Sequence, residues 1–103
     1  MTSFTILECE KASDFIVQNS PIIVDIRDAV AYQQGHIPGA QHVPPVNLFD
    51  FALQQDKNQP VLICCYHGIS SQQAAKFLVD QGFTDVYSLA GGYCAWAEAA
   101  VVG

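Results

Sequence analysis

Basic residues are scarce in this sequence. Its 103 residues carry ten acidic side chains and a formal net charge of -6. The only lysines and arginines are Lys11, Arg27, Lys57 and Lys76. Because four scattered cations cannot form a basic stripe, we expect neither a nucleic acid nor an anionic membrane as a partner.

Targeting segments and metal-binding motifs are also missing. The residues that follow Met1 include neither a basic flank nor a long apolar run, so we expect a cytoplasmic protein without a membrane anchor. Thiols stay reduced in that compartment, and the four cysteines should therefore be free. These are Cys9, Cys64, Cys65 and Cys94. Since no CxxC pair or Cys/His cluster is present, we expect no metal and no other cofactor.

The composition is that of a protein with a hydrophobic core. Half of the residues are apolar and 11% are aromatic, while glycine and proline are scattered along the chain. This argues against disorder, and the length suits one domain over residues 1–103. The sequence does not indicate an oligomeric state.

Short apolar runs alternate with helical patterns along the chain. The runs 22–25 and 61–64 are continuously apolar up to their ends, which is typical of parallel strands buried on both faces. We predict strands at 4–9, 22–25, 41–43, 61–64 and 85–88, and helices at 11–18, 29–34, 46–54, 70–81 and 93–100. This alternation predicts an α/β fold with a mainly parallel sheet and helices on both of its faces.

The segment that starts at Cys65 has the pattern of an anion-binding loop. A buried strand ends at Cys65, a short loop follows, and a helix begins near Ser70. Backbone N–H groups of such a loop and the positive end of the helix dipole both favour a thiolate. Gly68 permits a tight turn, and Ser70 and Ser71 can donate hydrogen bonds to sulfur or cap the helix.

The adjacent Cys64 should have a different role. Side chains alternate along a strand, so Cys64 should point away from the Cys65 face and into the core. Taken alone, Cys65 could equally be a small buried apolar residue, and only the loop and helix start that follow indicate chemistry. His67 can either donate to an anionic substrate or simply be exposed.

A second polar cluster lies at the end of the run 22–25. Asp25 and Arg27 are two residues apart, close enough for an ion pair. Because sites in open α/β sheets form beyond the carboxyl ends of the strands, Asp25 and Cys65 should border one crevice. We interpret Asp25 and Arg27 as residues that hold loops in place, and His36 is as readily a structural histidine in a turn.

Three segments together resemble the rhodanese family over almost the whole chain. They are Asp25-Ile26-Arg27 with Tyr32-Gln33-Gln34-Gly35-His36-Ile37-Pro38-Gly39-Ala40, the loop from Cys65 to Ser71, and Gly91-Gly92-Tyr93-Cys94-Ala95-Trp96. The loop is most similar to that of short, single-domain bacterial thiosulfate sulfurtransferases. The resemblance implies a three-layer rhodanese-like domain with a five-stranded, mainly parallel sheet.

The resemblance also implies a ping-pong sulfur transfer. The Cys65 thiolate would take the outer sulfur of thiosulfate as a persulfide and pass it to cyanide or to a thiol acceptor such as a dithiol or a thioredoxin-like protein. The persulfide would be held by the loop residues Tyr66, His67, Gly68, Ile69, Ser70 and Ser71. Asp25, Arg27 and His36 would support the site.

This loop lacks the cations that several larger rhodaneses carry. On a chain with a net charge of -6, we therefore expect weak steering of the thiosulfate dianion and a high KM. A neutral or protein-bound persulfide donor would avoid part of this repulsion.

Other activities and roles make different demands on the sequence. Phosphatases with a similar loop need Cys-x5-Arg, and Ser71 stands at the arginine position. A catalytically silent binding module would usually lack the loop cysteine. A sulfur-carrier role within a longer pathway would use the same chemistry as the enzyme.

Overall fold

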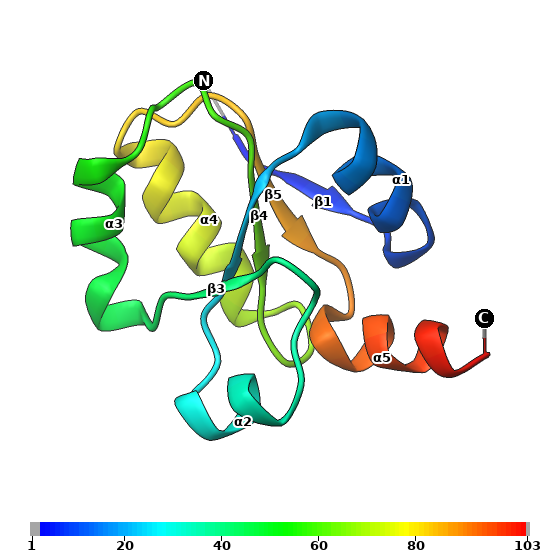
Figure 1. The fold of residues 1–103 in the computed structure, drawn as a ribbon. Coiled ribbons are helices and arrows are strands. Elements are labelled where there is room, and N and C mark those ends of the chain that lie inside the picture. Colours follow the sequence, from blue (N-terminus) through cyan, green and yellow to red (C-terminus); the bar gives the residue numbers. More distant parts are fainter. Residues whose placement is uncertain (1–2, 103) are drawn as a thin grey trace.

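Five short parallel strands form one sheet in the computed structural model, which describes residues 3–102. The strands are β1 (Thr5–Leu7), β2 (Ile22–Asp25), β3 (Gln41–His42), β4 (Val61–Cys64) and β5 (Val86–Leu89), in the spatial order β1-β5-β4-β2-β3. Every pairing is parallel, so all the carboxyl ends meet at one edge (Figure 1). The predicted α/β fold with a five-stranded sheet is confirmed.

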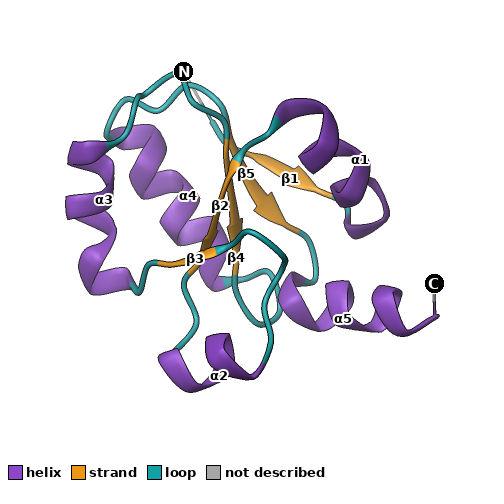
Figure 2. Ribbon diagram, in the orientation of Figure 1, coloured by secondary structure: helices purple, strands orange, loops and turns teal. Residues whose placement is uncertain are grey.

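Helices cover both faces of the sheet. On one side lie α1 (Cys9–Asn19) and α5 (Gly92–Val102), and on the other α3 (Leu48–Gln54) and α4 (Ser70–Asp80) (Figures 1 and 2). The short helix α2 (Ala29–Gln34) lies beyond the carboxyl ends of the strands, and the 3₁₀ turn η1 (Pro45–Asn47) leads into α3. Within residues 3–102, no helix is both long and apolar enough to span a bilayer.

The central strand β4 divides the core in two. Val61 and Ile63 face α3 and α4, whereas Leu62 and Cys64 face α1 and α5. All four side chains are buried because helices cover both faces of the strand. This is the arrangement that a continuous apolar run predicts, and it gives Cys64 and Cys65 opposite surroundings.

Several predicted boundaries were wrong. The first strand is three residues long rather than 4–9, because it pairs only with β5 and the chain turns into α1 at Cys9. The last strand ends at Leu89, and η1 replaces the first turn of the helix predicted at 46–54. The predicted domain 1–103 includes Met1, Thr2 and Gly103, which lie outside the described residues.

Candidate active site

Cys65 is the first residue after β4, the strand at the centre of the sheet, and only 4% of its surface is exposed. Its sulfur accepts hydrogen bonds from the backbone N–H of Gly68 at 3.1 Å and of Ser71 at 3.3 Å. The Ser71 hydroxyl lies 3.3 Å from the same sulfur. Three polar groups therefore converge on one sulfur atom at the start of α4.

These contacts change the acidity of Cys65. Burial by itself raises the pKa of the thiol, but hydrogen bonds from the Ser71 hydroxyl and from the N–H groups of Ser71, Gly68 and His67 outweigh it. The pKa of Cys65 consequently lies below the ordinary value for a thiol. Cys64 behaves in the opposite way, since burial raises its pKa to about 12.

Gly68 gives the loop its tight turn. Its φ of +87° lies in the left-handed region that disfavours side chains. A Cβ at this position would stand 2.7 Å from the Gly91 nitrogen and 3.0 Å from the Leu89 carbonyl oxygen. Glycine is required here because the loop lies directly against the turn that joins β5 to α5.

The first turn of α5 orients the peptides of the loop. The N–H of Tyr93 donates to the Cys65 carbonyl at 2.7 Å, and the N–H of Cys94 donates to the Tyr66 carbonyl at 3.1 Å. In a trans peptide, the C=O and N–H point in opposite directions. With the Tyr66 carbonyl held by α5, the His67 N–H of the same peptide points back toward the sulfur, which agrees with its effect on the Cys65 pKa.

Ser88 is a buried residue near this site that the sequence analysis missed. It lies on β5, and its hydroxyl is 2.7 Å from that of Ser71. The two serines therefore form a buried hydrogen-bonded pair that fixes the Ser71 hydroxyl beside the sulfur. A serine within an otherwise apolar buried strand was the available signal, because such a hydroxyl needs a partner.

Of the two roles open to Ser70 and Ser71, the structure of the described residues shows contact with the sulfur for Ser71 and a helix cap for neither. Helix α4 starts at Ser70 with no side-chain cap among the described residues, and Ser71 uses its hydroxyl on the sulfur and on Ser88. Ser70 is exposed and forms no hydrogen bond to the sulfur within residues 3–102.

Ser71→Ala tests whether the Ser71 hydroxyl lowers the pKa of Cys65. Losing the hydroxyl should raise the pKa of Cys65 and slow its alkylation by iodoacetamide about 3- to 10-fold at neutral pH. Because the thiolate is the reactive form, the rate rises with pH through the pKa, and the variant's profile should shift to higher pH and meet the wild type at its plateau. Ser70→Ala is the matched control. Superimposable profiles for Ser71→Ala and wild type would contradict the role of this hydroxyl.

The other loop side chains point away from the sulfur. Tyr66 is exposed and donates its hydroxyl proton to Asp28 at 2.5 Å, which ties the loop to the start of α2. His67 is exposed beside the Tyr66 ring, and Ile69 is 72% exposed. Among the described residues, the loop thus presents backbone groups and Ser71 to the sulfur, while its larger side chains form the outer rim.

Asp25 and Arg27 form a buried ion pair. Arg27 donates from Nη2 to Asp25 Oδ2 at 2.7 Å and from Nε to both carboxylate oxygens, while its backbone N–H donates to Oδ1 at 2.9 Å. The exposed fractions are 0% for Asp25 and 5% for Arg27, so removing either partner would leave a buried charge. Arg27 Nη2 also donates to the Gly35 carbonyl at 2.6 Å, which joins β2 to the end of α2.

His36 and its neighbours hold the segment between α2 and β3. His36 Nδ1 lies 2.7 Å from the Tyr32 carbonyl, and its ring stacks on the Tyr32 ring at 3.9 Å. The Tyr32 hydroxyl donates to the Ala40 carbonyl at 2.5 Å. These contacts describe a residue that orders a loop and does not contact the sulfur.

No metal site is evident in the part of the chain that the structure describes. Residues 3–102 contain no group of three or more histidine, cysteine or acidic side chains that could hold a metal ion. The four cysteines are free thiols.

Comparison with known proteins gives consistent matches in sequence and in structure. Residues 8–99 match the family of the Rhodanese-like domain. The chain is 48% identical over 99 residues to Thiosulfate sulfurtransferase GlpE of Shewanella oneidensis, covering 96% of this chain and 98% of that protein. It is 42% identical over 97 residues to the protein of the same name from Pseudoalteromonas translucida, covering 94% and 92%. A crystal structure of a rhodanese-like domain protein from Staphylococcus aureus has a TM-score of 0.80 at 26% identity, covering 90% of this chain and 91% of that one.

Proposed function

Because the chain belongs to the family of rhodanese-like domains, we propose that it is a thiosulfate sulfurtransferase in which Cys65 carries the transferred sulfur. Two relatives that match nearly their full length bear that name. The observation that carries the proposal is the Cys65 sulfur, held at the end of β4 by the Gly68 N–H, the Ser71 N–H and the Ser71 hydroxyl. Such donors stabilise a thiolate before the reaction and a persulfide anion after it.

The first half-reaction is a displacement at sulfur. The Cys65 thiolate attacks the outer sulfur of thiosulfate, an S–S bond forms to Cys65, and the S–S bond within thiosulfate breaks. Sulfite leaves with the electron pair of that bond, and Cys65 retains a persulfide anion. No general base is required, because the hydrogen bonds to the sulfur already lower the pKa of Cys65.

The second half-reaction regenerates the Cys65 thiolate. A thiophilic acceptor, either cyanide or a thiol, attacks the terminal sulfur, and the electron pair of the broken S–S bond returns to Cys65 as thiolate. Thiol acceptors include dithiols and a thioredoxin-like protein. We place this cycle in the cytoplasm, where a reducing milieu keeps Cys65 available as a thiol.

Loop support is the role proposed for the other polar residues. The ion pair of Asp25 with Arg27 and the stacked pair of His36 with Tyr32 order the chain between β2 and β3. The hydrogen bond from the Tyr66 hydroxyl to Asp28 connects that segment to the loop after Cys65.

Phosphatase activity is poorly supported by the same site. The position that holds the phosphate-clamping arginine in Cys-x5-Arg enzymes is Ser71, whose hydroxyl contacts the sulfur and Ser88. Arg27 cannot take its place, because its Nε and Nη2 atoms already donate to Asp25 and Gly35, which leaves no pair of donors for a bidentate grip on phosphate.

Intact-protein mass spectrometry tests the proposal directly. After incubation with thiosulfate and removal of excess reagent, the protein should gain the mass of one sulfur atom. Cyanide or dithiothreitol should remove it, with thiocyanate or hydrogen sulfide as the product. A protein that gains no sulfur and forms no thiocyanate would refute the activity.

The dependence on salt tests the predicted electrostatics. The net charge is -6 and no lysine or arginine lies in the loop from Cys65 to Ser71, so the thiosulfate dianion meets repulsion. Raising the ionic strength to about 0.15 M shortens the screening length to about 8 Å, so kcat/KM for thiosulfate should stay level or rise. Steady-state rates in a series of sodium chloride concentrations measure this. A steep fall would instead reveal local attraction.

A further inference from the structure

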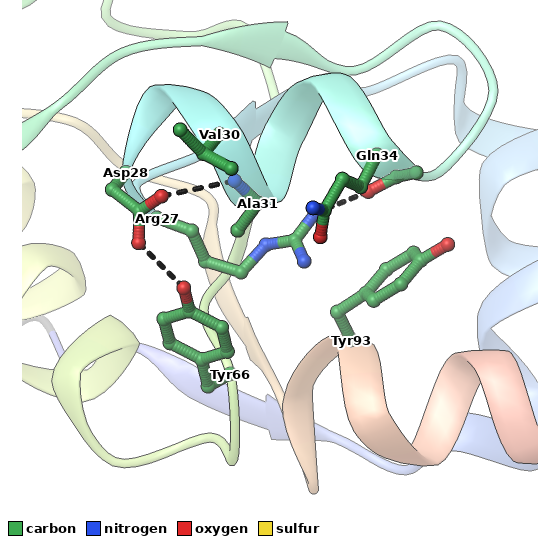
Figure 3. Close-up of a pocket in the computed structure, with 8 residues that line it drawn as sticks. Arg27, Asp28, Val30, Ala31, Gln34, Tyr66 and Tyr93 are labelled. Carbon is green, nitrogen blue, oxygen red and sulfur yellow. Dashed lines mark hydrogen bonds between the residues drawn. The ribbon is translucent and has the colours of Figure 1, made fainter.

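A pocket of about 270 Å³ lies beside the Cys65 loop, between α2 and the start of α5. Its lining residues are Arg27, Asp28, Val30, Ala31, Gln34, Gly35, Tyr66 and Tyr93 (Figure 3). Tyr66 directly follows Cys65, and the N–H of Tyr93 donates to the Cys65 carbonyl. Tyr66 and Tyr93 therefore connect the pocket to the loop that holds the sulfur, whereas Arg27, Asp28 and Gln34 form no hydrogen bond to the sulfur among the described residues.

Arg27 presents an unused donor to this pocket. Its Nε and Nη2 atoms donate to Asp25 and Gly35, whereas Nη1 has no partner among the described residues. No fully buried side-chain nitrogen or oxygen in that part of the chain lacks a partner, so Nη1 retains some accessible surface on a residue that lines the pocket. Two contacts fix the position of the guanidinium. Asp25 forms an ion pair with it, and the Tyr93 ring stacks on it with 4.2 Å between Arg27 Cζ and the ring centre.

Two other polar side chains, Gln34 and Tyr93, line the same end of the pocket. Figure 3 shows the Gln34 side chain on one side of the guanidinium and the Tyr93 ring on the other. The Tyr93 hydroxyl lies against Gly35, where a Cβ would stand 2.7 Å from it. A carboxylate suits this end of the pocket, since charge-assisted hydrogen bonds from a guanidinium to a carboxylate are among the strong ones.

The opposite wall carries a negative charge. The carboxylate of Asp28 accepts from the Tyr66 hydroxyl at 2.5 Å and from the Ala31 N–H at 2.9 Å. These hydrogen bonds lower the pKa of Asp28, with the bond from Tyr66 as the largest cause, so it is ionised at neutral pH. An ammonium group is the natural partner for an exposed carboxylate at the rim.

The balance of charge selects among ligands. Asp25 and Asp28 together carry two negative charges against the single positive charge of Arg27, which disfavours a dianion. The guanidinium equally disfavours a simple cation. A zwitterion matches the charges at both ends of the pocket, because its carboxylate can lie toward Arg27 Nη1 and Tyr93 while its ammonium lies toward Asp28.

We propose that this pocket is an acceptor subsite for small thiols that carry a zwitterionic α-amino acid group. The inference rests on the proposed function and specifies the acceptor of that same site. The acceptor thiol attacks the terminal sulfur of the Cys65 persulfide, and the electron pair of the broken S–S bond leaves with Cys65 as thiolate. The acceptor becomes a persulfide, and the proton of its attacking thiol moves to the transferred sulfur, which is now terminal, or to solvent.

Acceptor kinetics test the subsite. L-cysteine and L-homocysteine carry both charged groups, 3-mercaptopropionate lacks the ammonium, and cysteamine lacks the carboxylate. Because these thiols differ in intrinsic reactivity, the rate with each thiol is compared between the wild type and the variant.

Two substitutions test the two walls of the pocket. Asp28→Asn removes the charge but keeps an acceptor for Tyr66 and a helix cap. Tyr93→Phe removes the hydroxyl but keeps the ring on Arg27.

The two variants should show complementary losses. Asp28→Asn should lower kcat/KM about 5- to 10-fold for the amino acid thiols, relative to 3-mercaptopropionate. Tyr93→Phe should lower it about 3- to 10-fold for the same thiols, relative to cysteamine. The control Asp50→Asn removes an exposed carboxylate from α3 and should leave all the ratios unchanged. Equal effects on all four thiols would overturn the subsite.

A binding measurement separates the subsite from the sulfur chemistry. L-serine has the same zwitterion as L-cysteine without the thiol, and titrated into ¹⁵N-labelled protein it should shift the amide signals of Gln34, Gly35 and Tyr93. These shifts should be weaker in Asp28→Asn. Absence of persulfide would refute the proposed function while these shifts could still support the pocket. Persulfide formation without any shift or preference would overturn the subsite alone.

Discussion

Replacing Cys65 with serine is expected to abolish sulfur loading and to lower kcat/KM for thiosulfate by about 10³-fold or more. A serine hydroxyl is not ionised near neutral pH and cannot form a persulfide, so the hydrogen bonds from Gly68 and Ser71 would surround a group that cannot react. Thiocyanate formation and intact mass after thiosulfate treatment measure the two effects. The Cys65→Ser variant should lose the reaction but stay folded, and circular dichroism checks that it is folded.

Cys64→Ala is the matched control for this variant. Cys64 lies on the other face of the sheet among α1 and α5 residues, and burial raises its pKa to about 12. Loading should therefore persist in this variant, with a loss confined to stability of about 1–2 kcal/mol from the smaller side chain. Sulfur retained by Cys65→Ser and lost by Cys64→Ala would reverse the assignment of the nucleophile.

Gly92→Ala is expected to have the second-largest effect, although this residue does not contact the sulfur. Its φ is +60°, and an added Cβ would lie 2.4 Å from the Cys65 carbonyl oxygen and 2.6 Å from the Tyr66 carbonyl carbon and oxygen. The methyl group would push the loop off the first turn of α5 and break the bonds from Tyr93 and Cys94. We expect a loss of about 2–5 kcal/mol in unfolding free energy and a fall of about 100-fold or more in kcat/KM.

Gly39→Ala separates backbone strain from steric clash. Gly39 has a φ of +87°, but a Cβ there would meet nothing within 4 Å. Only the strain term of about 1–2 kcal/mol should remain, with near-normal kcat/KM. Chemical denaturation and the pH profile of Cys65 alkylation are the measurements, because a displaced loop should also raise the pKa of Cys65. Equal behaviour of the two alanine variants would refute the role of close packing at Gly92.

Some features of this protein followed from local sequence. The continuous apolar runs predicted β2 and β4 correctly, because a strand covered on both faces has no polar positions. Strand alternation likewise predicted that Cys64 and Cys65 would enter different environments, and they lie in separate core clusters. Boundaries were less accurate at the edge strand β1, where a single neighbour fixes the length of the pairing.

The donor set around Cys65 was only partly predictable. The short loop and the helix after it indicated converging N–H groups, and Gly68 and Ser71 supply them. The hydroxyl of Ser88 on β5 and the N–H groups of Tyr93 and Cys94, which bind the loop carbonyls, belong to segments 17 or more residues away. Local pattern carries no information on which distant groups a buried hydroxyl or carbonyl will find.

The sequence by itself determined the class of fold, the order of its elements and the cysteine most suited to act, because apolar periodicity and a strand-loop-helix pattern are local properties. Only the tertiary structure decided how the sulfur is held and what lies beside it. Parallel pairing brings the ends of β2, β4 and β5 to one edge, where α5 packs on the loop and the pocket of Arg27, Asp28 and Tyr93 forms. The lowered pKa of Cys65 thus depends in part on contacts between segments that are distant in sequence.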